Sequence, residues 1–110
     1  VVVANGTDVP VEKVDPLANF HCTVTREVPG TDTTFTESET LSPRRALKSH
    51  TIKNARAAFA EDVKGTLAPG KLADVAVLSE NILEAPADAI PRTEVTHTIV
   101  GGEVRYEQGR

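Results

Sequence analysis

Few residues of this chain have side chains suited to catalysis near neutral pH: carboxylates, three histidines and one cysteine. Among the carboxylates, Asp8 ends the short polar segment 5–8 that follows an apolar run at residues 1–4, and this run is typical of a strand buried on both faces. On residue types alone, residues 5–8 are also typical of an ordinary turn, because Asn, Gly and Asp favour turn conformations. On residue types alone a plain turn is therefore the favoured interpretation of Asp8, and a catalytic carboxylate at the carboxyl end of a barrel strand is the alternative.

The histidines and the cysteine do not form a pattern that binds a metal. His21 and Cys22 are adjacent on a predicted helix, so their side chains point about 100° apart. His50 has no second ligand at helical spacing, which favours a core histidine with satisfied hydrogen bonds. A single cysteine forms no disulfide within the chain, and packing in a core or an interface is the better interpretation of Cys22.

Local signals predict the elements that position these residues. The pairs Asp15-Pro16 and Ser42-Pro43 each combine a capping residue with a proline suited to the first helical position. Alternation of side chains replaces helical spacing after Gly70, which indicates strands. We therefore expect an α+β fold with helices near 16–27 and 43–60, strands near 1–5, 73–79, 94–100 and 103–107, and a hairpin turn at 101–102.

Two connecting segments have specific expectations. Residues 28–40 form a polar loop, in which Phe35 is the large apolar residue expected to anchor it. Gly65 and Gly70 bracket a tight turn before the apolar run that starts at Val75. Gly70 is predicted to adopt a positive φ or to lie against another backbone.

The bulk composition excludes several classes of protein. The formal net charge of -4 is too mild to indicate a nucleic-acid surface, and no apolar run approaches the roughly 20 residues needed to cross a bilayer. The chain contains no methionine and begins within a predicted buried strand, so we expect a piece of a larger polypeptide. A processed mature chain is the alternative. No signal peptide is recognisable, and we expect a cytoplasmic location.

A longer motif stands at residues 65–74, GTLAPGKLAD. It closely resembles the carboxyl-terminal signature of the amidohydrolase superfamily, whose members are metal-dependent hydrolases built on a (β/α)8 barrel and a small β-sandwich. The run Gly6-Thr7-Asp8 resembles the end of the eighth barrel strand in the same enzymes. The resemblance implies that residues 1–62 hold the last barrel strand with its helices and that residues 63–110 belong to the composite β-sandwich.

The resemblance also implies a chemistry. The subgroup that includes N-substituted formamide deformylases is the most similar, and its members hydrolyse C–N bonds other than peptide bonds in amide, formamide or N-acyl substrates. Zinc or a similar divalent ion polarises the carbonyl and lowers the pKa of water in such enzymes. Carried onto this chain, Asp8 is the residue that binds the metal and moves the proton of the attacking water. Residues 16–26 resemble the element that shapes the substrate pocket, where Arg26 faces either a substrate carboxylate or solvent.

The sequence departs from the family pattern in its metal ligands. The family needs a His-x-His pair, usually a metal-bridging lysine, and two further histidines, and His21, His50 and His97 match none of these. One carboxylate does not hold a catalytic zinc, which typically has three protein ligands. We therefore expect an active, metal-dependent parent enzyme with a small-molecule amide substrate, and an inactive isolated chain without a metal.

Two alternatives from other classes remain. The chain could be a structural or binding module, with Asp8 in a plain turn. It could also be an interaction protein whose exposed strands pair between chains. Because an apolar strand edge at residues 1–4 would seek a partner, we expect a homo-oligomer, a strand-swapped dimer, or pairing of this segment onto the hairpin sheet.

Overall fold

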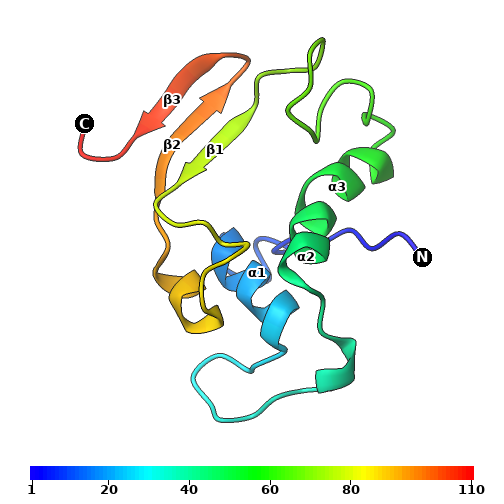
Figure 1. Cartoon of the computed structure of the whole chain (residues 1–110), viewed down its shortest axis with the longest axis vertical. Helices are drawn as coiled ribbons and strands as arrows, with labels where there is room; N and C mark the ends of the chain where they lie inside the picture. Colours follow the sequence, from blue (N-terminus) through cyan, green and yellow to red (C-terminus); the bar gives the residue numbers. More distant parts are fainter.

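The computed structural model describes all residues from 1 to 110 and has the predicted α+β fold. Three helices come first along the chain, and a three-stranded antiparallel sheet follows on the other side of the molecule (Figure 1). No helix is both long enough and apolar enough to cross a bilayer. The elements are α1 (Pro16–Thr25), a 3-10 turn (Glu37–Glu39), α2 (Pro43–His50), α3 (Ile52–Ala57), β1 (Val75–Leu78), a 3-10 helix η2 (Ala87–Arg92), β2 (Val95–Val100) and β3 (Glu103–Glu107).

Helix α1 begins as its sequence predicts. The Asp15 side chain accepts a hydrogen bond of 3.0 Å from the Ala18 backbone N–H, and Pro16 occupies the first turn. The helix ends at Thr25, two residues before the predicted end at 27. Arg26 adopts a left-handed conformation with φ 61, and its N–H donates to the Cys22 carbonyl, which closes the helix there.

The predicted helix at 43–60 is divided into α2 and α3 at Thr51. A continuous α-helix would direct the Thr51 backbone N–H to the Leu47 carbonyl. The Thr51 hydroxyl instead donates to that carbonyl at 2.8 Å, and the Thr51 N–H makes a long 3.4 Å bond to the Lys48 carbonyl. The expected Ser42 side-chain cap is wrong as well, because its side chain makes no capping hydrogen bond.

The sheet has the order β1-β2-β3, and its three strands lie within the predicted ranges. The turn between β2 and β3 is Gly101-Gly102, with φ of 59 and 84, as a two-residue hairpin turn requires. Asp74, the last residue of the 65–74 motif, accepts a hydrogen bond of 2.8 Å from the Gly101 N–H. This contact holds the hairpin turn against the start of β1.

The predicted strand at residues 1–5 is wrong. Residues 1–4 pair with no strand, and Val1, Val2 and Val3 are all exposed. A strand buried on both faces needs neighbours that supply a hydrogen-bond ladder, and none lies beside this segment. Pairing of this segment onto the hairpin sheet is therefore wrong too. The polypeptide is anchored only from Asn5 onward, where its N–H donates to the Ser49 carbonyl at 3.0 Å.

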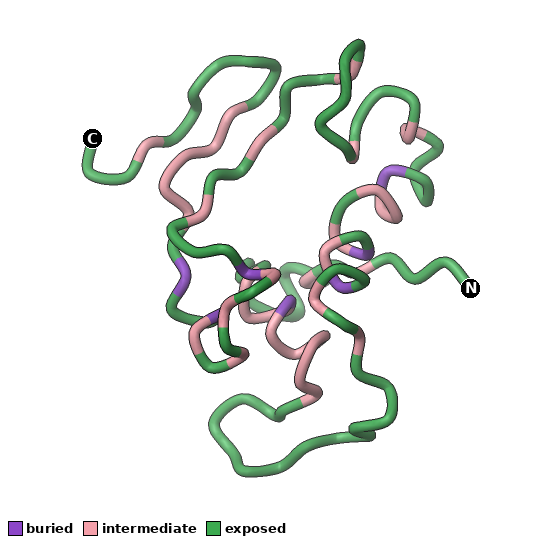
Figure 2. Tube along the Cα trace, in the orientation of Figure 1, coloured by how far each residue is buried: buried purple, intermediate pink, exposed green.

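The hydrophobic core is small and lies between α1, α2 and η2 (Figure 2). It consists of Phe20, Ala46, Ile82 and Ile90, each at most 7% exposed. No residue of the three strands is fully buried. The sheet is thus joined to the helices mainly through η2 and the loop that precedes it, and its faces stay largely open.

The loop at residues 28–40 is not anchored by burial of Phe35, which is 65% exposed. The contact is instead with the end of α1. The Phe35 N–H donates to the Arg26 carbonyl at 2.9 Å, and the Arg26 guanidinium lies 5.7 Å from the centre of the Phe35 ring. Phe35 therefore anchors the loop as expected, but through its backbone and through the contact of its ring with Arg26 rather than by burial.

The turn before β1 uses its two glycines differently. Gly70 has the predicted positive φ, 87, but a Cβ there would meet no atom within 4 Å. Gly65 has φ 95, and a Cβ there would lie 2.8 Å from the Ala55 Cβ and 3.0 Å from the Ile52 Cα. Gly65 is therefore the position where the turn approaches another backbone.

This difference predicts unequal costs for two matched substitutions. Gly70→Ala should lower the free energy of unfolding by about 1–2 kcal/mol, the cost of a left-handed conformation for an L-residue. Gly65→Ala should cost about 1–3 kcal/mol more, because α3 must also shift. Urea denaturation midpoints of the two variants measure the difference, and equal shifts would contradict the close approach at Gly65.

Candidate active-site segment

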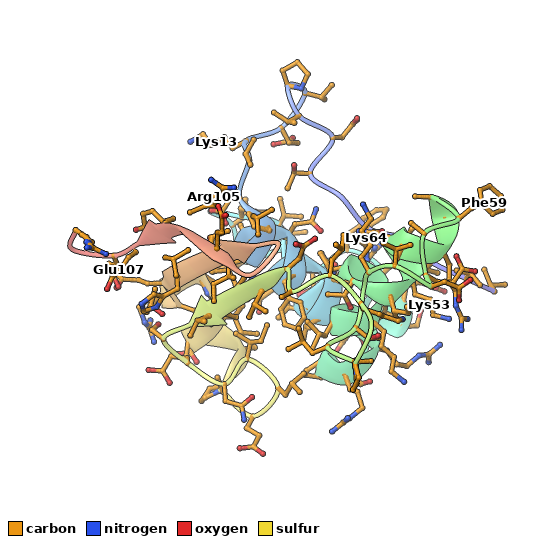
Figure 3. All side chains as sticks on the ribbon, turned by 90° about the horizontal axis from the view of Figure 1, so that it is seen from above. Lys13, Lys53, Phe59, Lys64, Arg105 and Glu107 are labelled. Carbon is orange, nitrogen blue, oxygen red and sulfur yellow. The ribbon has the colours of Figure 1, made fainter.

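Asp8 lies in an exposed turn that stands clear of the helices. Its φ is 53, a left-handed conformation that Asp tolerates better than most residues, and its carbonyl accepts a hydrogen bond of 2.8 Å from the Val11 N–H. The loop continues to Lys13 and projects from the body of the molecule (Figure 3). The Asp8 carboxylate is thus presented outward rather than folded into the core.

The segment leading to Asp8 is held by side chains from all three helices. The Asn5 side chain donates to the Ser49 hydroxyl at 2.8 Å, and the Asn54 side chain donates to the Asn5 carbonyl at 2.8 Å. The Asn19 side chain donates to the Gly6 carbonyl at 3.0 Å. Side-chain hydrogen bonds therefore fix the backbone two and three residues before Asp8, where a strand ladder was predicted.

His50 connects α2 to this arrangement. Its Nε2 lies 2.7 Å from the Asn19 Oδ1, and its Nδ1 lies 2.9 Å from the Ala46 carbonyl oxygen. The ring also packs against Phe20, with the ring centres 5.7 Å apart. His50 thus lies half-buried on the packed side of α2 with Nε2 hydrogen-bonded to Asn19, which agrees with a structural rather than a metal-binding histidine.

The other chemistry-bearing residues lie apart from Asp8. His21 Nε2 is 3.5 Å from a Glu27 carboxylate oxygen, and His97 Nε2 is 3.7 Å from one of Glu107. The Arg26 Nε donates to the Phe35 carbonyl at 3.1 Å, so this guanidinium is engaged with the loop after α1. That Arg26 faces a substrate carboxylate in the full enzyme stays a prediction.

The residues present in this chain do not by themselves complete a metal site. No three His, Cys, Asp or Glu side chains are grouped closely enough to hold an ion. Asp8 offers one carboxylate, whereas a catalytic zinc typically has three protein ligands. Any metal that Asp8 binds would need further ligands from outside these 110 residues.

An open groove lies beside the Asp8 turn. It has a volume of about 380 Å³ and is lined in part by Thr7, by Asn19 and by Cys22 of α1. Thr7 is adjacent to Asp8 in sequence, so the groove and the carboxylate lie on the same part of the molecule. Helix α1 thus contributes both to the groove and to the support of the Asp8 segment.

The sequence motifs and the geometry are shared with a known family. The pattern of the amidohydrolase family matches residues 1–106, nearly the whole chain. The chain belongs to this family. The Bacillus subtilis (strain 168) protein named "Putative amidohydrolase YtcJ" is 30% identical over 110 residues, which make up 98% of this chain and 21% of that protein.

Two further proteins are similar. The Arabidopsis thaliana "Protein LONG AFTER FAR-RED 3" is 38% identical over 105 residues, which cover 96% of this chain and 18% of that protein. The crystal structure of an amidohydrolase from Thermotoga maritima MSB8 shares the fold, with a TM-score of 0.73 and 19% identity over 98% of this chain and 24% of that chain. The present chain thus spans about a fifth of the length of its curated relatives.

Sequence reasoning missed most of the polar cluster around Asn5. Asn19, Ser49 and Asn54 are each ordinary on their own, and their contacts join residues 13 to 49 positions apart. One signal was present in the sequence: His50 and Asn54 are four residues apart, which places two hydrogen-bonding side chains on one helix face. Their partners in the first 20 residues were not visible from that spacing.

Cys22 provides a test of the local environment of α1. Burial raises the pKa of its thiol, and the Glu27 carboxylate raises it further, outweighing a backbone hydrogen bond that lowers it. Less of the reactive thiolate is then present at any given pH, so iodoacetamide should modify Cys22 more slowly than it modifies the urea-unfolded chain at pH 8. Glu27→Gln should speed the reaction. Equal rates in folded and unfolded chains would contradict this environment.

Proposed function

We propose that this chain is the carboxyl-terminal portion of a metal-dependent amidohydrolase that cleaves C–N bonds other than peptide bonds. The observation that carries the proposal is the family match over residues 1–106, within which Asp8 stands at an exposed, supported turn beside a groove. In this proposal residues 1–62 complete the (β/α)8 barrel, and residues 63–110 form part of a composite β-sandwich. The cytoplasmic location stays a prediction.

Asp8 is proposed as a metal ligand and as the base that receives the proton of the attacking water. A divalent metal, zinc in this proposal, would supply carbonyl polarisation and a lowered pKa of water. The remaining ligands would come from outside these 110 residues, because no three potential ligands are grouped closely enough within the chain to hold an ion. The substrate class is a small-molecule amide, with a formamide or an N-acyl compound favoured by the resemblance to N-substituted formamide deformylases.

The proposal predicts a strong effect of Asp8→Asn in the full-length enzyme. Asn keeps the size of the side chain but removes the charge and the basicity needed for proton transfer. Such transfer by a positioned group is typically worth about 10²–10⁴-fold, so kcat should fall by that factor while the fold is retained. Steady-state kinetics measure kcat, and circular dichroism shows whether the fold is retained. Near-normal turnover would contradict the assignment of Asp8.

The isolated 110-residue chain is the natural control. It should show no hydrolysis of formamides or N-acyl amino acids above background, with or without added zinc, because Asp8 is its one proposed ligand. Zinc-dependent turnover by this chain, lost again on chelation, would show that the site is complete without further residues and would overturn the proposal.

The exposed surface supports a second proposal, that the chain associates with other polypeptide. Its accessible surface is 7905 Å², whereas a compact monomer of 11.7 kDa exposes about 5,900 Å². Only 7 of 110 residues are buried, and the outer edges of β1 and β3 are unpaired. A homo-oligomer or a strand-swapped dimer formed through residues 1–4 would cover part of this surface. The same surface is compatible with a non-catalytic interaction module.

Association of the isolated chain predicts a concentration-dependent mass. Sedimentation equilibrium should give a dimer or larger species at micromolar concentrations, because apolar surface and strand edges would be buried on contact. Replacing Val1, Val2 and Val3 by Ser should shift the equilibrium towards monomer. A monomer at all concentrations would contradict association between copies of this chain.

A further inference from the structure

The polar side chains around Asn5 and Gly6 form one connected network. It runs from His50 through Asn19 to the Gly6 carbonyl, and from Ser49 and Asn54 to Asn5. We propose that this network, and the Asn19–His50 pair above all, is a positioning device that sets the location of Asp8 for proton transfer. The inference rests on the proposed function of Asp8. It goes beyond that function because it gives a positioning role to Asn19 and His50, which bind neither metal nor substrate in the proposal.

The contacts of the network converge just before Asp8. Three of them end on main-chain atoms of Asn5 or Gly6, namely those from the Ser49 carbonyl, Asn54 and Asn19. Two residues of extended chain span at most about 7 Å, so fixing Gly6 restricts where the Asp8 backbone can lie. The Asp8–Val11 hydrogen bond then closes the turn on its far side. Within this chain residues 1–4 pair with no strand, so a strand ladder does not contribute to holding Asp8.

The Asn19 amide is held in one orientation. Its Nδ2 donates to the Gly6 carbonyl, so its Oδ1 faces His50 and accepts the hydrogen bond from Nε2–H. Removing the imidazole donor would leave the Oδ1 unpaired between α1 and α2. The amide would then be free to rotate, and its bond to Gly6 would be lost with it.

The second branch of the network is more deeply buried. Ser49 is 2% exposed, and its hydroxyl accepts from the Asn5 side chain while donating to the Ala46 carbonyl at 2.6 Å. Hydrogen bonds shielded from water are stronger than exposed ones. The His50 Nδ1 lies 2.9 Å from the same Ala46 carbonyl oxygen, so the two branches approach each other at this point of α2.

Hydrogen exchange of the 110-residue chain tests the positioning directly. The Asn5 N–H is bonded to the Ser49 carbonyl and should be protected. His50→Phe keeps a ring against Phe20 but removes the donor, and it should raise the exchange rate of the Asn5 N–H at least about tenfold while leaving β2 and β3 unchanged. His50→Gln, which offers a side-chain N–H, should restore protection. The matched control His97→Phe removes a histidine from the sheet and should leave the Asn5 exchange rate unchanged.

Two exchange results overturn the inference. One is an unprotected Asn5 N–H in the parent chain, which would mean that the segment is not held in solution. The other is unchanged exchange of the Asn5 N–H in His50→Phe, which would mean that the imidazole does not support this segment. Faster exchange across the whole chain in both histidine variants would also count against a local role, because it would report a general loss of stability.

Kinetics of the full-length enzyme test the link to Asp8. A misplaced catalytic group costs about 10–100-fold, so His50→Phe should lower kcat by that factor with KM unchanged, and His50→Gln should recover most of it. If His50 acts through Asp8, His50→Phe should have no further effect on kcat in an Asp8→Asn background. An undiminished effect there overturns the positioning role. Near-normal kcat in Asp8→Asn alone would instead overturn the proposed function, and the exchange experiment still decides whether the network holds the segment.

Discussion

The packing of Phe20 against Ala46 and Ile90 is the contact on which the rest of the fold depends. Ala46 is fully buried, and its small side chain lets α1 lie close to α2. Ile90 brings η2 onto the same cluster, and β2 begins only a few residues later, at Val95. One small core therefore orients the helices relative to one another and ties the sheet to them.

A core this small leaves most of the orientation to directional contacts. With few buried apolar groups, the hydrophobic effect favours compactness but specifies little about where an irregular segment lies. Hydrogen bonds from Asn19, Ser49 and Asn54 supply that specification for residues 5 and 6. The Asp74 contact to Gly101 does the same for the hairpin turn. The polar contacts thus act where apolar packing is thin.

Much of the fold follows from local chemistry that the sequence displays. Asp15-Pro16 specifies where α1 begins, and Gly101-Gly102 specifies the hairpin, because each acts within a few residues. The division at Thr51 depends on a hydroxyl taking the place of a backbone N–H, a competition that helical periodicity does not reveal. The prediction of a strand at residues 1–5 is wrong for a different reason, since a strand requires neighbouring strands, which composition does not reveal.

The candidate site was predictable only in part, for the same physical reason. Asp8 could be singled out by its place after an apolar run and by resemblance to a family, but its support comes from residues up to 49 positions away. Long-range polar contacts leave little trace in local patterns.

The exposure of the Asp8 carboxylate explains why hydrogen bonds to the backbone of residues 5 and 6 are needed. A carboxylate that hydrogen-bonds within its own chain is located by those bonds, but it is then less available to another group. Asp8 keeps its side chain outward, so its position has to be fixed through the backbone. Asn19 and His50 do this from one side, and the Asp8–Val11 turn does so from the other. Holding the main chain while leaving the carboxylate free is the arrangement that an acidic residue awaiting further ligands or a substrate requires.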